Sequence, residues 1–163
     1  MDVFVEQMVV KPQKGKDYAL KFLIALAAVI LSAFFVIFLA IMAFIPIVGI
    51  IYAAYYLISG LDCEYEYIVT NGEIDIDKIA GKRKRTRLIT ADVRKFTAFG
   101  KLENAGKLPD KATIVDAADG SGTAFYADFV HGKLGETRLI FSPNEKVIEA
   151  IKPFIPRMIK REF

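Results

Sequence analysis

The feature that most constrains this chain is an uncharged run in its N-terminal half. Residues 22–61 contain no Asp, Glu, Lys, Arg or His. As one straight helix this run would extend about 60 Å, which is twice the roughly 30 Å thickness of the hydrocarbon core of a bilayer. Divided in two, each half approaches the about 20 apolar residues that one crossing requires. The run therefore predicts two membrane-spanning helices.

A proline near the middle of the run indicates where it divides. Pro46 has no amide hydrogen to donate, and it disfavours helical dihedral angles at Ile45. We therefore expect a transmembrane helical hairpin over residues 18–61, with helices at about 18–42 and 47–61 and a tight turn at the proline. The second stretch is short for a crossing, so the alternative is that it lies buried or in the membrane interface.

The charges on either side of the run predict its orientation. Four lysines precede it: Lys11, Lys14, Lys16 and Lys21. After it, residues 78–95 contain eight Lys or Arg and one acidic residue, Asp92. Because cytoplasmic flanks are enriched in Lys and Arg, we expect a multi-pass protein of the cell membrane with both termini in the cytoplasm. A signal peptide fits poorly, since its apolar region is only about 7 to 15 residues long.

The segment before the run is short and mixed in composition. The stretch "MDVFVEQMVV" predicts a short helix with Asp2 as its N-cap, lying on the membrane surface. A flexible terminus is the alternative. The expected organisation is an N-terminal cytoplasmic segment (1–17), the transmembrane hairpin (18–61) and a cytoplasmic domain (62–163).

After Leu61 the apolar residues recur with a period of two, which is typical of strands. Strands are expected at residues 64–70 and 73–79, joined by Asn71-Gly72, the preferred residue pair of a type I′ turn. A loop at Ala80-Gly81-Lys82 leads to the next strand. This loop length sets the register, and it predicts that Asp77 lies opposite Arg85 and Asp75 opposite Arg87.

The rest of the chain predicts further strands and a final helix. Strand composition recurs at residues 93–99, 112–118, 123–130 and 136–142, with a long polar link over 100–111. The sequence Ser142-Pro143-Asn144-Glu145 is typical of a capping box that starts a C-terminal helix. Pro153 and Pro156 would kink or divide that helix. The expected fold class is α+β.

Seven antiparallel strands closed by a C-terminal helix is the layout of a pleckstrin-homology (PH)-like barrel. The stretches "YEYIVTNGEIDIDKI" and "KRKRTRLITADVRKF" carry a resemblance to a family of uncharacterised bacterial membrane proteins in which two spans precede such a domain. The resemblance covers nearly the whole chain and implies architecture and location, but no activity. Eukaryotic PH domains that bind phosphoinositides place basic residues in the first hairpin loop. That loop is only Asn71-Gly72 here, so headgroup binding of that type is not implied.

Few residues lie in patterns typical of catalysis. His131 is the only histidine and Cys63 the only cysteine, and no phosphate-binding glycine loop or nucleophile motif is present in the sequence. Glu73, Asp75 and Asp77 share one strand face and could hold a cation, but neutralisation by the facing arginines is the simpler interpretation. We therefore expect no catalytic residue, no metal and no cofactor, and the chain is not expected to be an enzyme.

A basic run after the second strand is the candidate contact site for a membrane surface or a partner. It consists of Lys82, Arg83, Lys84, Arg85 and Arg87. The alternative role of these residues is a charge ladder with the acidic strand beside them. Strand geometry places Lys82 and Lys84 on the opposite side from Arg85 and Arg87, so one ladder cannot neutralise them all. The remaining bases would orient the domain on anionic lipid.

These observations favour a non-enzymatic, membrane-anchored binding module that presents a PH-like domain at the inner leaflet. Its expected partners are the lipid bilayer and a protein whose identity the sequence does not indicate. The alternative is a structural or accessory subunit of a membrane complex whose interface is the transmembrane hairpin. A transporter is disfavoured because the spans lack ionisable residues. The net charge of +3 is too small to favour nucleic acid.

Overall fold

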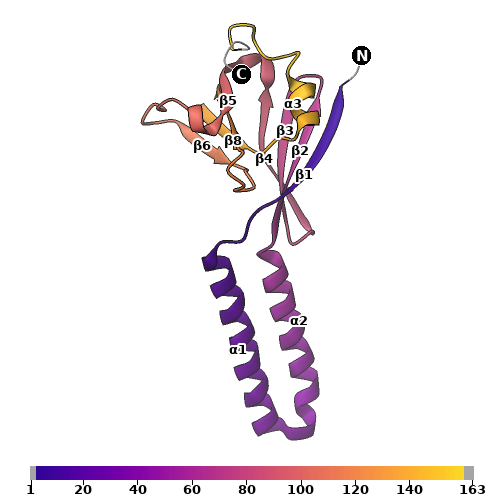
Figure 1. The fold of residues 1–163 in the computed structure, drawn as a ribbon. Helices are drawn as coiled ribbons and strands as arrows, with labels where there is room; N and C mark the ends of the chain where they lie inside the picture. Colours follow the sequence, from indigo (N-terminus) through magenta and orange to yellow (C-terminus); the bar gives the residue numbers. More distant parts are fainter. Residues whose placement is uncertain (1–2, 160–163) are drawn as a thin grey trace. The chain divides into compact units, whose positions relative to one another are not determined.

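The computed structural model describes residues 3–159, which form two compact units. Of the described residues, 13–63 and 80–84 form the helix unit, and 3–12, 64–79 and 85–159 form the sheet unit. Figure 1 shows the helices and strands of both units. Because a segment between two strands belongs to the helix unit, this division does not follow the order of the chain.

The helix unit is built from two apolar helices, α1 (Gly15–Leu39) and α2 (Phe44–Gly60), joined by a 3-10 turn, η1 (Ala40–Ala43). The two helices lie side by side (Figure 1). No residue of α1 or α2 is buried. Taken as one helical region, Gly15–Gly60 is long and apolar enough to cross a membrane by length and composition. Two separate crossings stay a prediction.

The predicted break at Pro46 is wrong, because the interruption comes earlier in the chain. Ala40 has a positive φ of 45°, a conformation outside the helical region, and α2 already begins at Phe44. Pro46 is the third residue of α2. A backbone N–H in the first turn of a helix has no partner within that helix, so a proline is tolerated there. The apolar run therefore bends without help from its proline.

The first sheet of the sheet unit has four strands in the order β1-β2-β3-β4. They are β1 (Phe4–Val10), β2 (Cys63–Thr70), β3 (Glu73–Ala80) and β4 (Lys84–Asp92). The strands predicted at 64–70 and 73–79 are confirmed. Asn71 and Gly72 have φ values of 48° and 91°, as the predicted turn between these strands requires.

The N-terminal segment forms a strand, so the short helix predicted there is wrong. β1 pairs antiparallel with β2, with Val5 opposite Val69 and Gln7 opposite Tyr67. The alternation of Phe4, Glu6 and Met8 with Val5 and Val9 suits a strand with one face toward a core. Tertiary pairing with β2 therefore outweighs the local helix signal.

The second sheet corrects the predicted barrel. Its strands are β5 (Phe96–Lys101), β6 (Thr113–Asp116), β7 (Phe125–His131) and β8 (Gly135–Phe141), in the order β5-β7-β8-β6. β6 pairs with β8 in parallel. The described residues thus form two four-stranded sheets in place of a closed antiparallel barrel of seven strands. The α+β class is correct, and the arrangement is consistent with a PH-like fold.

Short 3-10 turns border the first strand of this sheet. η2 (Val93–Lys95) precedes β5 and η3 (Leu102–Asn104) follows it. The strand expected from residue 93 therefore starts only at Phe96. Asp92 caps η2 by accepting a hydrogen bond from the Arg94 N–H at 3.0 Å.

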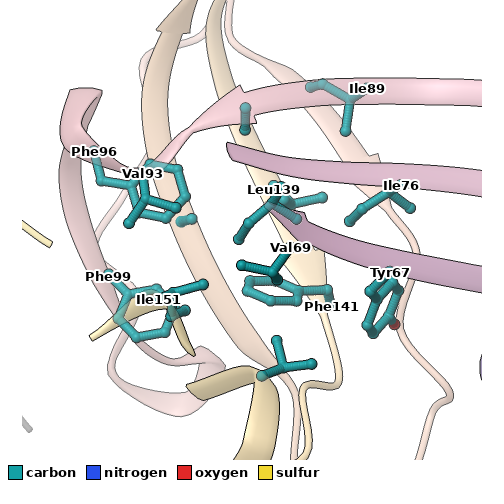
Figure 2. Close-up of a cluster of buried hydrophobic side chains, with 14 of the residues drawn as sticks. Tyr67, Val69, Ile76, Ile89, Val93, Phe96, Phe99, Leu139, Phe141 and Ile151 are labelled. Carbon is teal, nitrogen blue, oxygen red and sulfur yellow. The ribbon is translucent and has the colours of Figure 1, made fainter. Parts of the chain in front are cut away.

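A hydrophobic core lies between the sheets and the C-terminal helix, α3 (Glu145–Ile151) (Figure 2). Tyr67 from β2 and Phe141 from β8 are fully buried, and their rings meet edge to face at 5.8 Å. Such aromatic pairs stabilise a core beyond the area they bury. The core joins strands from both sheets, so the sheet unit folds as one body.

The C-terminal helix starts after a polar N-cap residue and ends before a proline. The N-cap is not the residue that the sequence predicted. Asn144 is the N-cap, and its side chain accepts a hydrogen bond from the Val147 N–H at 2.9 Å. Ser142, the predicted cap, donates to Asp119 instead. The helix ends at Ile151, two residues before Pro153, as the proline predicts.

Candidate functional site

The basic run lies in the turn between β3 and β4 and in the first part of β4. Lys82, Arg83 and Lys84 belong to the helix unit, and Arg85 and Arg87 belong to the sheet unit. The run is not a uniform basic surface, because its members have different contacts within their own units.

Arg83 is engaged with the end of α2. Its guanidinium lies over the Tyr56 ring, 3.9 Å from the centroid. Its Nη2 donates to the Tyr56 carbonyl oxygen at 2.9 Å and to Ser59 Oγ at 2.8 Å. A cation at the C-terminus of a helix interacts favourably with the helix dipole. Arg83 therefore caps α2.

The turn before Arg83 is shaped to approach α2 closely. Gly81 has a φ of +57°, and a Cβ at this position would lie 2.8 Å from the Ser59 carbonyl oxygen. Its N–H donates to the Asp62 carbonyl oxygen at 2.7 Å. Only glycine combines this backbone conformation with this approach. The turn is thus fixed to the last residues of the helix unit's second helix.

Asp62 joins the beginning of α1 to the end of α2. Lys21 Nζ lies 2.7 Å from Asp62 Oδ1, and Gln13 Nε2 donates to the same oxygen at 2.5 Å. The sequence reasoning missed this group. Its signal was that Lys21 and Asp62 are the charges that border the uncharged run on each side.

Lys82 and Lys84 are the free cations of the run. Both are exposed, and neither makes an ion pair or a hydrogen bond with a residue in the range 3–159. Lys82 has a φ of 56°, so it occupies the left-handed region in the turn. Of the five predicted contact residues, these two keep a full charge available to another molecule.

Arg85 and Arg87 form the predicted charge ladder in the sheet unit. Arg87 Nη1 lies 2.5 Å from Asp75 Oδ1, and Arg85 Nε lies 3.8 Å from Asp77 Oδ2. Both predicted ion pairs are therefore present. Asp77 also contacts Arg87 Nε directly. Asp77 thus contacts two arginines, and Arg87 contacts two aspartates.

Glu66 on β2 is a third acid in this ladder, and the sequence reasoning missed it. It is buried, and its Oε2 contacts Arg85 Nη2 without accepting a hydrogen bond from any described residue. Burial raises the pKa of Glu66, a side-chain hydrogen bond with Glu6 raises it further, and Arg85 opposes the rise. The available signal was the position of Glu66 in the alternating pattern of β2. The sequence reasoning did not expect β1 to pair beside β2, with Met8 opposite Glu66.

This raised pKa predicts a pH dependence of stability. The protonated form of Glu66 is favoured in the folded state, so its contribution is fully present below the unfolded pKa of about 4.5 and is lost as pH rises through the folded pKa. We expect Glu66→Gln to abolish this loss. The unfolding free energy of the variant relative to the wild type should rise with pH above about 4.5 and then level off.

The measurement is chemical denaturation of the full chain across this pH range, with Glu73→Gln as the control at an exposed carboxylate. A constant difference between Glu66→Gln and the wild type at every pH would contradict the assignment.

The remaining polar candidates have local structural contacts. His131 Nδ1 accepts from the N–H groups of Lys133 and Leu134, both at 3.3 Å, within the turn after β7. Cys63 is half-buried at the start of β2. Within residues 3–159, no group of three His, Cys, Asp or Glu side chains is placed to hold a metal ion.

A family model described as Bacterial PH-like domain (DUF6106) matches residues 1–161. The match includes both the helical region and the two sheets. No curated protein and no solved structure shows significant similarity to the chain.

Proposed function

We propose that this protein, which belongs to the bacterial PH-like domain family (DUF6106), is a membrane-anchored binding module without enzymatic activity. The helical region Gly15–Gly60 is its anchor. The observation that carries this proposal is the exposed apolar surface of that region. Large side chains such as Phe22, Ile37 and Phe44 are each at least two thirds exposed. Water-soluble proteins rarely leave contiguous apolar patches of this kind uncovered, so lipid is the expected surroundings.

Two crossings in opposite directions are the proposed topology. With 25 and 17 residues, α1 and α2 extend about 38 and 26 Å, close to the roughly 30 Å of the hydrocarbon core. The ion pair between Lys21 and Asp62 brings the start of α1 and the end of α2 together. The start of α1 and the end of α2 then lie at the same face of the membrane. The basic residues that flank the helices favour the cytoplasmic face.

Lys82 and Lys84 are the proposed contacts with anionic lipid. A basic residue near an anionic surface contributes about 1 kcal/mol. Arg83, Arg85 and Arg87 contact groups of the chain itself, so the lysines provide the charge that meets the lipid. Two free lysines suffice to orient the module, while the helices anchor it.

We expect the double variant Lys82→Asn, Lys84→Gln to bind anionic lipid more weakly than the wild type. Asn is chosen at position 82 because it tolerates the positive φ there. The loss of two contacts corresponds to about a thirtyfold drop in affinity at low salt. The measurement is native mass spectrometry of the full chain, titrated with phosphatidylglycerol.

The matched control removes two exposed lysines elsewhere, Lys107→Gln with Lys111→Gln. It has the same net charge as the double variant and should bind like the wild type. Equal losses in both double variants would show that net charge alone attracts the lipid, and would contradict a specific contact.

An accessory subunit of a membrane complex is the second candidate, because helices of other proteins would cover the same apolar surface. A photo-crosslinking residue at Ile37, which is 76% exposed, distinguishes the two in native membranes. Adducts with lipid favour the binding module. Abundant adducts with one protein at this position favour the accessory subunit.

A further inference from the structure

The sheet unit contains a cleft beside α3 that the proposed function does not use. Its volume is about 400 Å³. It is lined by Phe99, Lys101, Asn104, Phe125, Ile148, Lys152 and Ile155. These residues come from β5, η3 and β7 on one side and from α3 and the turn after it on the other. The volume lies in the range of roughly 300 to 1,000 Å³ that is usual for small-molecule sites.

The floor of the cleft is apolar and belongs to the core. Phe99 is only 1% exposed, and its ring stacks on that of Phe125 with centroids 5.6 Å apart. Figure 2 shows Phe99 close to Ile151 of α3 within the buried cluster. Ile155 is also buried. Because packed aromatic side chains form its floor, the cleft is already present without a ligand, and binding does not have to supply the free energy to form it.

Hydrogen bonds from β1 fix the wall formed by α3. The Asn144 N–H donates to Gln7 Oε1 at 2.8 Å, and Gln7 Nε2 donates to the Ser142 carbonyl oxygen at 3.0 Å. One side chain of β1 therefore holds both residues at the entry to α3. The position of α3 therefore depends on β1, which is also the edge strand of the first sheet.

The rim of the cleft is cationic. Lys101 and Lys152 are exposed, and neither has an ion pair or a hydrogen bond with a residue in the described part of the chain. Asn104 adds an amide that can donate hydrogen bonds. No carboxylate is among the lining residues. The rim therefore complements an anion, while the floor complements a hydrocarbon.

We propose that this cleft binds a single-chain fatty acid. The carboxylate lies between Lys101 and Lys152, and the alkyl chain lies over Phe99 and Phe125. One chain is favoured over two because the volume is near the lower end of the usual range. The site lies within the sheet unit, so this inference does not depend on how the helices sit in a membrane.

The test uses dodecanoate with a diazirine near its methyl end, added to the full chain in detergent and photoactivated. Mass spectrometry of the digested protein then maps the adducts. We expect adducts at Phe125 and Ile148 that unlabelled dodecanoate suppresses and dodecanol does not. The variant Lys101→Glu, Lys152→Glu should lower labelling of the cleft by about a hundredfold, since each lysine provides a charge-assisted contact.

Two variants separate this site from general effects. Lys146→Glu changes an exposed charge on α3 outside the lining and should leave cleft labelling unchanged. Ile148→Trp fills the cleft and should remove the labelling while the melting temperature is kept. Both variants leave the charges of the rim in place.

Three results would overturn the proposal. The first is labelling confined to α1 and α2, which would indicate simple partition into an apolar surface. The second is cleft labelling that is equal in the wild type and in the Lys101→Glu, Lys152→Glu variant. The third is labelling that occurs only in a chain ending at Ile159, which would assign the cleft to residues 160–163 of the chain itself.

Discussion

Asp128→Ala is expected to lower the free energy of unfolding by about 3 kcal/mol, because it leaves a buried arginine without its counter-charge. Arg138 on β8 is only 7% exposed, and its Nε and Nη2 donate to the two carboxylate oxygens of Asp128 on β7, both at 2.6 Å. The remaining contacts of Arg138, with the Gly106 carbonyl oxygen and the Tyr126 ring, do not neutralise its charge. Chemical denaturation of the full chain measures the loss.

A double-mutant cycle with Arg138→Met separates the pair from its surroundings. The double variant should be more stable than the sum of the single losses predicts, since no unpaired charge remains. Asp110→Ala, at an exposed position in the link before β6, is the control and should change stability by less than about 0.5 kcal/mol. A loss below about 1 kcal/mol for Asp128→Ala would contradict this account.

Asp77→Lys is the second large effect, with an expected loss of at least about 3 kcal/mol. Asp77 is 3% exposed and contacts both arginines of the charge ladder, so a lysine at this position would be a buried cation beside two other positive charges. Adding Arg87→Asp should recover part of the loss because Arg87 contacts Asp77 directly. Adding Arg85→Asp should recover less, because Arg85 makes its closer contact with Glu66.

The same denaturation measurement checks the ladder. Losses that are additive in both double variants would contradict the register of β3 and β4. Recovery that is greater with Arg85→Asp would contradict the assignment of Arg87 as the closer partner of Asp77.

Local patterns predicted the first sheet well. The strands around Asn71-Gly72 and the pairing of Asp75 with Arg87 follow from period-two alternation and from one turn, both of which involve neighbouring residues. The end of α3 before Pro153 is equally local. Such features depend on few distant contacts, so one sequence is sufficient to predict them.

Features that depend on distant pairing were missed. β1 becomes a strand because β2 provides its partner about sixty residues later, and nothing within "MDVFVEQMVV" specifies that partner. The parallel pairing of β6 with β8 likewise depends on a connection through β7. These two pairings explain why the predicted barrel was wrong.

Only the part of the candidate site that depends on local patterns was predicted. The charge ladder followed from strand register, but the capping of α2 by Arg83 required knowledge of where the turn lies beside Ser59 and Tyr56. The burial of Glu66 required β1. The cleft beside α3 combines residues from 99 to 155, so no local pattern indicated it.

Accessibility of single cysteines from outside the cell tests the central proposal most directly. Two variants each contain one cysteine in a Cys63→Ser background. The first carries Met42→Cys in η1, where Met42 is 77% exposed, and the second carries Lys111→Cys in the sheet unit. A membrane-impermeant maleimide added to intact cells should label Met42→Cys, and should label Lys111→Cys only after the cells are permeabilised. Labelling of Lys111→Cys in intact cells, or of Met42→Cys only after permeabilisation, would contradict an anchor that crosses twice and keeps the sheet unit in the cytoplasm.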